Sequence, residues 1–180
     1  MTSLHAVFAY VCGQQHCWAP GGLPLPFCHR CTGLYAGGFI AAVACGWLRP
    51  APGPRLLWLH GLLLLQMVPF GYHWLAQDAA WSTIAGQLFA CGLVYYLALA
   101  PLVRLGLWRP ASPARVSVYA ATVLVGLVAV QVAARADDAR AGTVLAWAGA
   151  AMLPVYAVLV LANLWLLAVA PWARRGPAVE

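Results

Sequence analysis

Four of the six cysteines lie close together near the amino terminus, and histidines are interleaved with them. Cys12 and Cys17 form a C-x4-C pair, and Cys28 and Cys31 form a C-x2-C pair beyond a loop rich in Pro and Gly. A C-x2-C pair can place two thiolates on one tetrahedral metal ion, and a second pair with an imidazole completes the ligands that zinc prefers. The spacing therefore makes a metal site the first hypothesis.

The C-x2-C pair also has the features of a redox-active thiol pair. A long apolar run begins directly after Cys31, so Cys28 and Cys31 are expected at a helix amino terminus, where the helix dipole and Arg30 favour the thiolate. Thiolates exchange with disulfides as readily as they bind metals. Structural disulfides, which an extracytoplasmic location permits, are a third interpretation. The spacing alone does not decide among the metal site, the redox-active pair and the structural disulfides.

The composition indicates what surrounds these cysteines. Of 180 residues, 64% are hydrophobic, and the charged ones are ten Arg, no Lys and four acidic residues. This excludes an ordinary soluble domain and a disordered chain. A nucleic-acid partner is not expected, because the Arg residues stand singly or in pairs at the edges of apolar runs rather than in a dense patch. The lipid bilayer is the expected partner, and Cys45 and Cys91, inside apolar runs, are expected to pack as small apolar side chains.

Five uncharged runs approach or exceed the roughly 20 residues that a helix needs to cross a bilayer. We therefore predict an all-α integral membrane protein, one transmembrane domain over residues 1–180, with five spans near 31–48, 56–77, 79–103, 116–134 and 141–173. Residues 1–31 form a Cys/His-rich segment. The run Met1–Cys12 is too short to span and lacks the basic start and cleavage site of a signal peptide. It is expected to be a short interfacial or re-entrant helix.

The Arg residues predict the orientation in the cell membrane. With five spans, the side that holds the amino-terminal segment receives three Arg, and the other side receives seven. Short cytoplasmic loops carry the excess of positive charge. We therefore expect the carboxyl terminus in the cytoplasm and the Cys-rich segment outside. The loop after the second span returns to the cysteine side and brings His73 there.

The stretch from Gly21 to Gly37 resembles a known family signature. It is similar to G-G-x-Q-L-P-V-C-x-R-C-T-G-x-Y-x-G of domain-of-unknown-function family 2085, small prokaryotic membrane proteins. Cys12 resembles the first Cys of an earlier C-H-Q motif, but Gly13 stands where its His would be, and His16-Cys17-Trp18 stands where the family has R-S-F. The resemblance covers roughly the first half of the chain. It implies a membrane fold and a site at the cysteines, and it implies no activity.

Because Gly13 stands in place of the family's His, we expect His16 or Cys17 to replace that His as a ligand. The hypothesis is then that zinc or a similar soft-ligand metal is bound by the residues Cys12, Cys17, Cys28 and Cys31, with His16 as a further ligand. Arg30 would offset thiolate charge, and His29 and His73 would act as surrounding or alternate ligands.

The competing hypotheses are a membrane thiol–disulfide oxidoreductase using Cys28 and Cys31, and a structural protein with a disulfide-stapled loop. Whether the protein is an enzyme stays open, and no catalytic or cofactor-binding residue is assigned. A homo-oligomer is compatible with the sequence, and a protein partner is not identified. His60 is expected to form an interhelical hydrogen bond, and Gly33-x3-Gly37 to form a close-packing face.

Overall fold

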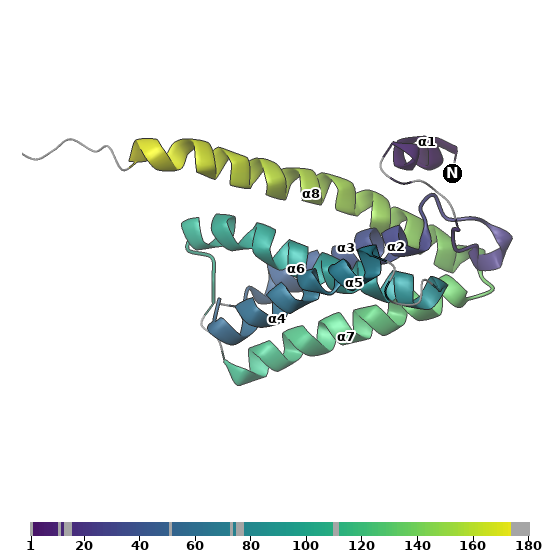
Figure 1. Ribbon diagram of the computed structural model, residues 1–180, viewed down its shortest axis with the longest axis horizontal. Helices are drawn as coiled ribbons and strands as arrows, with labels where there is room; N and C mark the ends of the chain where they lie inside the picture. The colour runs from purple at the N-terminus through teal and green to yellow at the C-terminus, as the bar shows by residue number, and fades with distance from the viewer. Residues whose placement is uncertain are drawn as a thin grey trace, which may run out of the picture.

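The computed structural model describes residues 2–10, 12, 16–50, 52–72, 74, 78–109 and 112–173, and over these ranges it is helical with two isolated β-bridges and no strand. The all-α prediction is confirmed. Most of the helices run along the long axis of one bundle (Figure 1). In chain order they are α1 (Thr2–Ala9), η1 (Pro20–Gly22), α2 (His29–Thr32), η2 (Gly33–Gly37), α3 (Gly38–Leu48), α4 (Pro54–Leu65), α5 (Met67–Gly71), α6 (Ala79–Arg104), α7 (Pro113–Arg135) and α8 (Ala139–Ala173).

Four helices are long and apolar enough to cross a membrane. They are His29–Leu48, which joins α2, η2 and α3, then Ala79–Arg104, Pro113–Arg135 and Ala139–Val169. These four agree with the first, third, fourth and fifth predicted runs. The described part of the chain is therefore a helical bundle of membrane-protein character, as the composition predicts.

The second predicted run, 56–77, is not one continuous helix. It consists of α4 and α5, which are separated at Gln66, while residues 73 and 75–77 lie outside the described residues. Pro69 explains the break, because proline has no N–H to donate to the carbonyl four residues earlier, at Leu65, and its ring crowds that carbonyl. Gln66 is held at the break, where its Nε2 donates a hydrogen bond of 2.9 Å to the carbonyl of Ala85 on α6.

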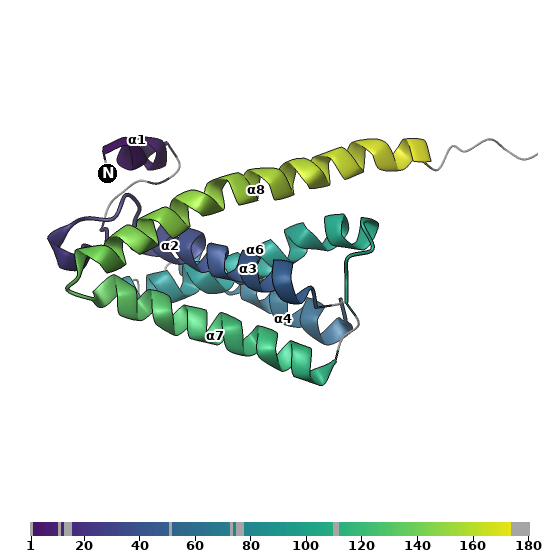
Figure 2. The same cartoon turned by 180° about the vertical axis from the view of Figure 1, so that it is seen from behind.

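The pair α4 and α5 nevertheless carries the chain back along the bundle (Figures 1 and 2). After α3 ends, the Arg49 carbonyl accepts a hydrogen bond of 3.1 Å from the Arg109 N–H, so this end is shared with the α6–α7 loop. At the start of α6, Thr83 Oγ1 lies 3.0 Å from the His29 carbonyl at the beginning of α2. The segment between α3 and α6 therefore joins opposite ends of the bundle.

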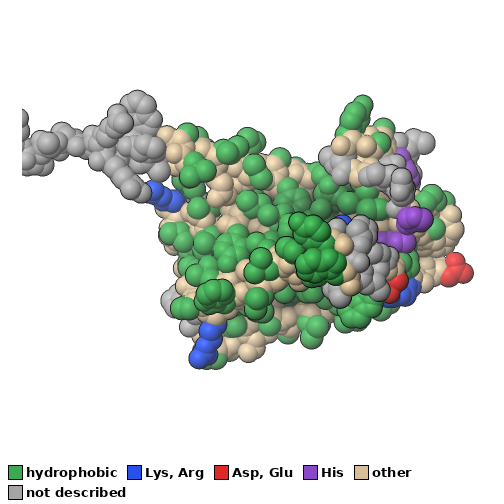
Figure 3. Space-filling view, viewed as in Figure 1, with side chains coloured by type: hydrophobic (Ala, Val, Ile, Leu, Met, Phe, Trp, Pro, Cys, Tyr) green, Lys and Arg blue, Asp and Glu red, His purple; other side chains and the backbone are tan. Residues whose placement is uncertain are grey.

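The two ends of the bundle differ in charge. One end, which we call the Arg end, holds five arginines near the end of α3, the start of α4, the end of α6 and the start of α7. They are Arg49, Arg55, Arg104, Arg109 and Arg115. The opposite end, the Cys end, holds the three described acidic residues, Asp78, Asp137 and Asp138, together with the cysteine-rich segment. Figure 3 shows only basic charged side chains at the first end, and acidic, histidine and some basic side chains at the second, where Arg30, Arg135 and Arg140 also lie.

Helix α6 packs against α2 and η2 almost backbone to backbone. A Cβ added at Gly33 would meet the carbonyl oxygen of Thr83, and one added at Gly86 would meet the carbonyl oxygen of Arg30. A Cβ at Gly37 would meet the side chain of Gln87. The Gly33-x3-Gly37 face therefore allows the close approach that small residues give membrane helices.

A buried polar contact also links the helices that lie around α6. His60 on α4 is 1% exposed; its Nδ1 lies 2.8 Å from the Leu56 carbonyl and its Nε2 lies 2.8 Å from the hydroxyl of Tyr119 on α7. In a neutral imidazole, Nδ1–H donates to Leu56 and the Tyr119 hydroxyl donates to Nε2. The His60 ring stacks on Tyr95 with ring centroids 4.0 Å apart. His60 therefore makes an interhelical hydrogen bond, as expected.

We predict that Gly86→Ala destabilises the protein, while Gly46→Ala does not. At Gly86 the added methyl would collide with a backbone carbonyl, and overpacking of this kind costs roughly 1–3 kcal/mol. At Gly46 on α3 nothing lies within 4 Å of an added Cβ, so alanine only raises helix propensity. Thermal unfolding in detergent measures the difference. Equal melting temperatures for Gly86→Ala and the wild type would contradict the packing.

Candidate metal centre

The C-x2-C pair lies at the start of α2. Cys28 is the N-cap residue, with extended backbone angles, and Cys31 follows one helical turn later. The carbonyl of Cys28 accepts hydrogen bonds from the Thr32 N–H, at 2.8 Å, and from Thr32 Oγ1, at 3.1 Å. Residues three apart in a helix lie on the same face, so both thiols lie on one face of the first turn of α2.

Cys12 joins this pair from the segment that follows α1. Its N–H donates a hydrogen bond of 2.8 Å to the Phe8 carbonyl, and its side chain is buried. The Cys28 N–H in turn donates to Cys12 Sγ at 3.2 Å. The Sγ atoms of Cys12, Cys28 and Cys31 all lie within 4.8 Å of one another, close enough to hold a metal ion. We call these three residues the thiol group.

Aromatic side chains support the thiol group from α1 and η2. Phe8 on α1 is fully buried, and its ring packs edge-on against Phe27, at 4.9 Å, and against Tyr35, at 5.1 Å. This small cluster attaches α1 and the Cys12 segment to the bundle, and α1 stands apart from the long helices at the Cys end (Figures 1 and 2). That α1 lies in the membrane interface remains a prediction.

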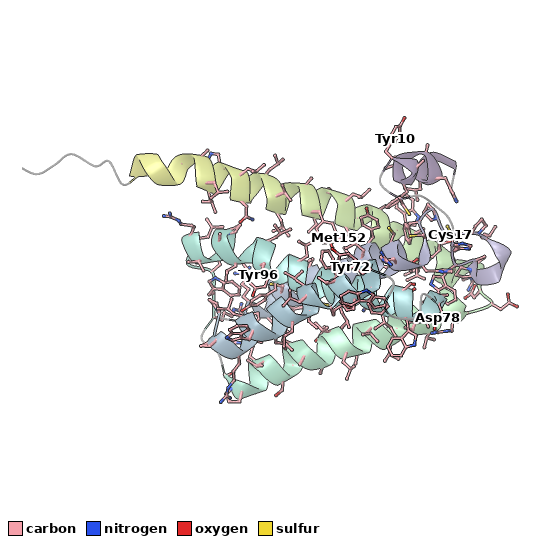
Figure 4. The ribbon with its side chains drawn as sticks, in the orientation of Figure 1. Tyr10, Cys17, Tyr72, Asp78, Tyr96 and Met152 are labelled. Carbon is pink, nitrogen blue, oxygen red and sulfur yellow. The ribbon has the colours of Figure 1, made fainter. Side chains whose placement is uncertain are left out.

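Cys17 lies next to the thiol group without being part of it. It pairs with Cys28 in an isolated antiparallel bridge, next to a hydrogen bond of 3.1 Å from the His29 N–H to the His16 carbonyl. Figure 4 labels Cys17 at the Cys end of the bundle, between α1 and the start of α6 near Asp78. His16 is exposed and adopts a left-handed backbone conformation, with φ of 56°.

The electrostatics of the site favour a thiolate at Cys28. A hydrogen bond from the Cys31 thiol, supported by hydrogen bonds from nearby backbone N–H groups and from Cys12, holds the pKa of Cys28 at about 5 although burial opposes this. Burial, reinforced by the charges of Cys12 and Cys28, raises the pKa of Cys17. A thiolate at Cys28 is the species that binds a metal or attacks a disulfide.

Two residues that spacing did not single out hold the cysteine loop against α6. Trp18 Nε1 donates a hydrogen bond of 2.9 Å to Thr83 Oγ1, the same hydroxyl that contacts the His29 carbonyl. The Trp18 ring lies 4.9 Å from the His29 ring and 5.5 Å from the guanidinium carbon of Arg135. No local pattern near Thr83 indicates this role, because its partners are 54 and 65 residues away in the chain.

The structure thus brings together three of the five predicted ligands. Cys17 is adjacent, and His16 is an exposed neighbour of the bridge. The His29 ring packs on Trp18, and His73 lies outside the described residues. Cys45 and Cys91 are buried in α3 and α6, as expected for packing residues.

The fold and the thiol group define a polytopic helical membrane protein with a cysteine cluster at one end of its bundle. Residues 12–96 match the model of the DUF2085 family, described as a predicted membrane protein. The matched region covers 85 of the 180 residues, and the family resemblance is confirmed. It contains the thiol group and the packing of α2 and η2 against α6. No curated protein and no solved structure matches the chain.

We predict that Cys31→Ala moves the alkylation profile of Cys28 to higher pH in reduced, metal-free protein. The thiol hydrogen bond from Cys31 is the largest cause of the low Cys28 pKa, so its loss destabilises the thiolate. The midpoint of iodoacetamide modification at Cys28, followed by peptide mass spectrometry, should rise by about one pH unit or more.

Cys31→Ser is the matched control for this prediction. A serine hydroxyl still donates a hydrogen bond to Cys28, so the midpoint should stay near that of the wild type. A wild-type midpoint close to that of an ordinary cysteine would contradict the described electrostatics.

Proposed function

We propose that this protein binds one zinc ion, or a similar soft-ligand metal, at the membrane surface through the thiol group and Cys17. The observation that carries the proposal is that the Cys12, Cys28 and Cys31 sulfurs lie within 4.8 Å of one another. Sulfurs around a tetrahedral Zn²⁺ are about 3.8 Å apart, given Zn–S bonds of about 2.3 Å. Small side-chain rotations therefore suffice to bring the three sulfurs onto one ion.

Cys17 is the proposed fourth ligand. It stands opposite Cys28 in the antiparallel bridge, and residues opposite each other in such a pair have Cβ atoms roughly 4.5–5.5 Å apart. Two thiolates at that separation reach a common ion. His16, next to Cys17, is the alternative ligand, and its imidazole would give a Cys3His set.

A closed set of four protein ligands is typical of a structural metal site. Here the ion would join the segment after α1, the loop before α2 and the first turn of α2. Arg30 is proposed to offset part of the negative charge that four thiolates leave around a divalent ion, and His29 and His73 are proposed to surround the site. The metal would then hold the cysteine loop over the Cys end of the bundle.

The proposed topology has five spans, with the pair α4 and α5 as the second. The segment between α3 and α6, which contains this pair, joins opposite ends of the bundle, and the 18 residues from Pro54 to Gly71 reach about 27 Å at 1.5 Å per helical residue. That length is close to the hydrocarbon thickness. The excess of Arg at the Arg end supports placing that end and the carboxyl terminus in the cytoplasm, and the thiol group outside.

A second candidate function is thiol–disulfide exchange by Cys28 and Cys31. It is favoured by one observation, the N-cap position of Cys28 with its low pKa and a hydrogen bond from Cys31. In this function Cys28 would attack a substrate disulfide, and Cys31 would then displace the substrate thiol to leave a Cys28–Cys31 disulfide. Cys12 would not be required for that exchange, whereas it is required for the metal site.

We predict one zinc per chain in protein purified without chelators, and loss of that zinc in Cys12→Ser, Cys28→Ser and Cys31→Ser. Removing one thiolate from a closed site lowers metal affinity strongly. Elemental analysis per mole of chain is the measurement, and Co²⁺ substitution reports thiolate ligation by its charge-transfer absorption. Cys17→Ser and His16→Ala, compared side by side, identify the fourth ligand.

Cys91→Ser is the control, because Cys91 is buried in α6 away from the thiol group. It should retain the wild-type metal content. Absence of stoichiometric metal in the wild type would reject the proposal. Thiol–disulfide exchange would be favoured instead by two results together. Cys28 and Cys31 would be fully alkylated before any chelator is added, and an added disulfide would oxidise this pair in the wild type and in Cys12→Ser alike.

For the topology, we predict that an impermeant maleimide labels Asp78→Cys and Asp137→Cys in intact cells, and labels Gly53→Cys and Ser112→Cys only after lysis. The first two positions lie at the Cys end and the last two at the Arg end. Peptide mapping separates these sites from the native cysteines. Labelling of Gly53→Cys and Asp78→Cys from the same side would show that the segment with α4 and α5 does not cross.

A further inference from the structure

A groove opens between the last turns of α6 and the second half of α8, at the Arg end. Its volume is about 400 Å³, within the range of small-molecule sites. Its lining is apolar except for one side chain, Arg104, and includes Pro101, Leu105, Ala162, Trp165 and Leu166. The groove is far from the thiol group, which lies at the opposite end of the bundle.

A polar contact closes the inner end of this groove. Pro101 has no N–H to donate to the carbonyl of Leu97, four residues earlier in α6. Asn163 on α8 takes the place of that donor, because its Nδ2 lies 2.7 Å from the Leu97 carbonyl, and also 2.7 Å from the Leu159 carbonyl of its own helix. This contact joins α6 and α8 just before the groove begins, so the groove is bounded by protein on the Cys side and continues toward the Arg end.

The charge of the groove indicates an anionic occupant. Arg104 is exposed in the last turn of α6, and the three acidic residues that the structure describes all lie at the Cys end. A second copy of the chain inserted with the same orientation would bring its own Arg end to this depth, and like charges would then meet. An anionic group from the membrane surface has the complementary charge.

We propose that the groove binds an anionic phospholipid, with its phosphate on Arg104 and an acyl chain between Pro101, Leu105, Ala162 and Leu166. Trp165, 64% exposed, then lies at headgroup level, where tryptophan is enriched in membrane proteins. The apolar lining accommodates the chain of any phospholipid. Arg104 distinguishes an anionic headgroup from a zwitterionic one.

Native mass spectrometry of the detergent-purified chain, titrated with palmitoyl-oleoyl phosphatidylglycerol or phosphatidylcholine, tests the proposal. The wild type should bind phosphatidylglycerol about fivefold more tightly, the factor expected for one arginine at an anionic surface. Arg104→Gln should abolish this preference, because it weakens phosphatidylglycerol binding more than phosphatidylcholine binding. Ala162→Phe, which fills the groove, should weaken binding of both lipids.

Arg55→Gln is the matched control, since it removes the same charge at the same end but lies at the start of α4, outside the groove. It should keep the wild-type preference. Equal binding of the two lipids by the wild type, or an equal loss in Arg55→Gln and Arg104→Gln, would overturn the proposal. None of these outcomes depends on the metal content of the Cys end.

Discussion

The rest of the structure depends on the contact between α6 and the backbone of α2 and η2. Glycine on both sides allows the helices to approach until backbone atoms meet, with Gly33 beside the Thr83 carbonyl and Gly86 beside the Arg30 carbonyl. In lipid, such close packing replaces the hydrophobic driving force that water supplies to soluble proteins. Because α2 begins at Cys28, the same contact determines where the C-x2-C pair stands relative to the bundle.

Helix α6 is also the acceptor for polar side chains from three directions. The amides of Gln66, Gln131 and Asn163 donate to the α6 carbonyls of Ala85, Ala80 and Leu97. Each donor belongs to a different part of the bundle: the α4–α5 break, α7 and α8. A polar group without a partner in hydrocarbon costs several kcal/mol, so these contacts stabilise the three amide N–H donors and fix which helix faces meet. Pro101 is tolerated for a related reason, since the Asn163 amide donates to the Leu97 carbonyl that the proline leaves without a helical donor.

The two ends of the bundle carry different chemistry. The Cys end combines thiols, aromatic rings and the described acidic residues, and it is held together by Trp18, Thr83 and Phe8. The Arg end has basic side chains and an apolar groove. A concentration of Arg at one end is typical of membrane proteins, whose short cytoplasmic loops carry an excess of positive charge.

The sequence by itself determined the class of protein, the family resemblance and four of the five predicted runs. Runs of apolar residues and the placement of Arg depend only on local composition, and they predicted four of the long helices and the charge difference between the ends. The pairing of Cys28 with Cys31 was equally predictable, because both lie within one helical turn.

Only the tertiary structure decided which further residues meet that pair. Cys12 joins the thiol group because Phe8 packs on Phe27 and Tyr35, whereas Cys17, equally close in the sequence pattern, stands beside it. The hydrogen bond between Trp18 and Thr83 likewise depends on where α6 packs. The physical reason is that insertion into lipid responds to average hydropathy over a whole run, while ligand geometry depends on ångström-scale packing between segments that are distant in the chain.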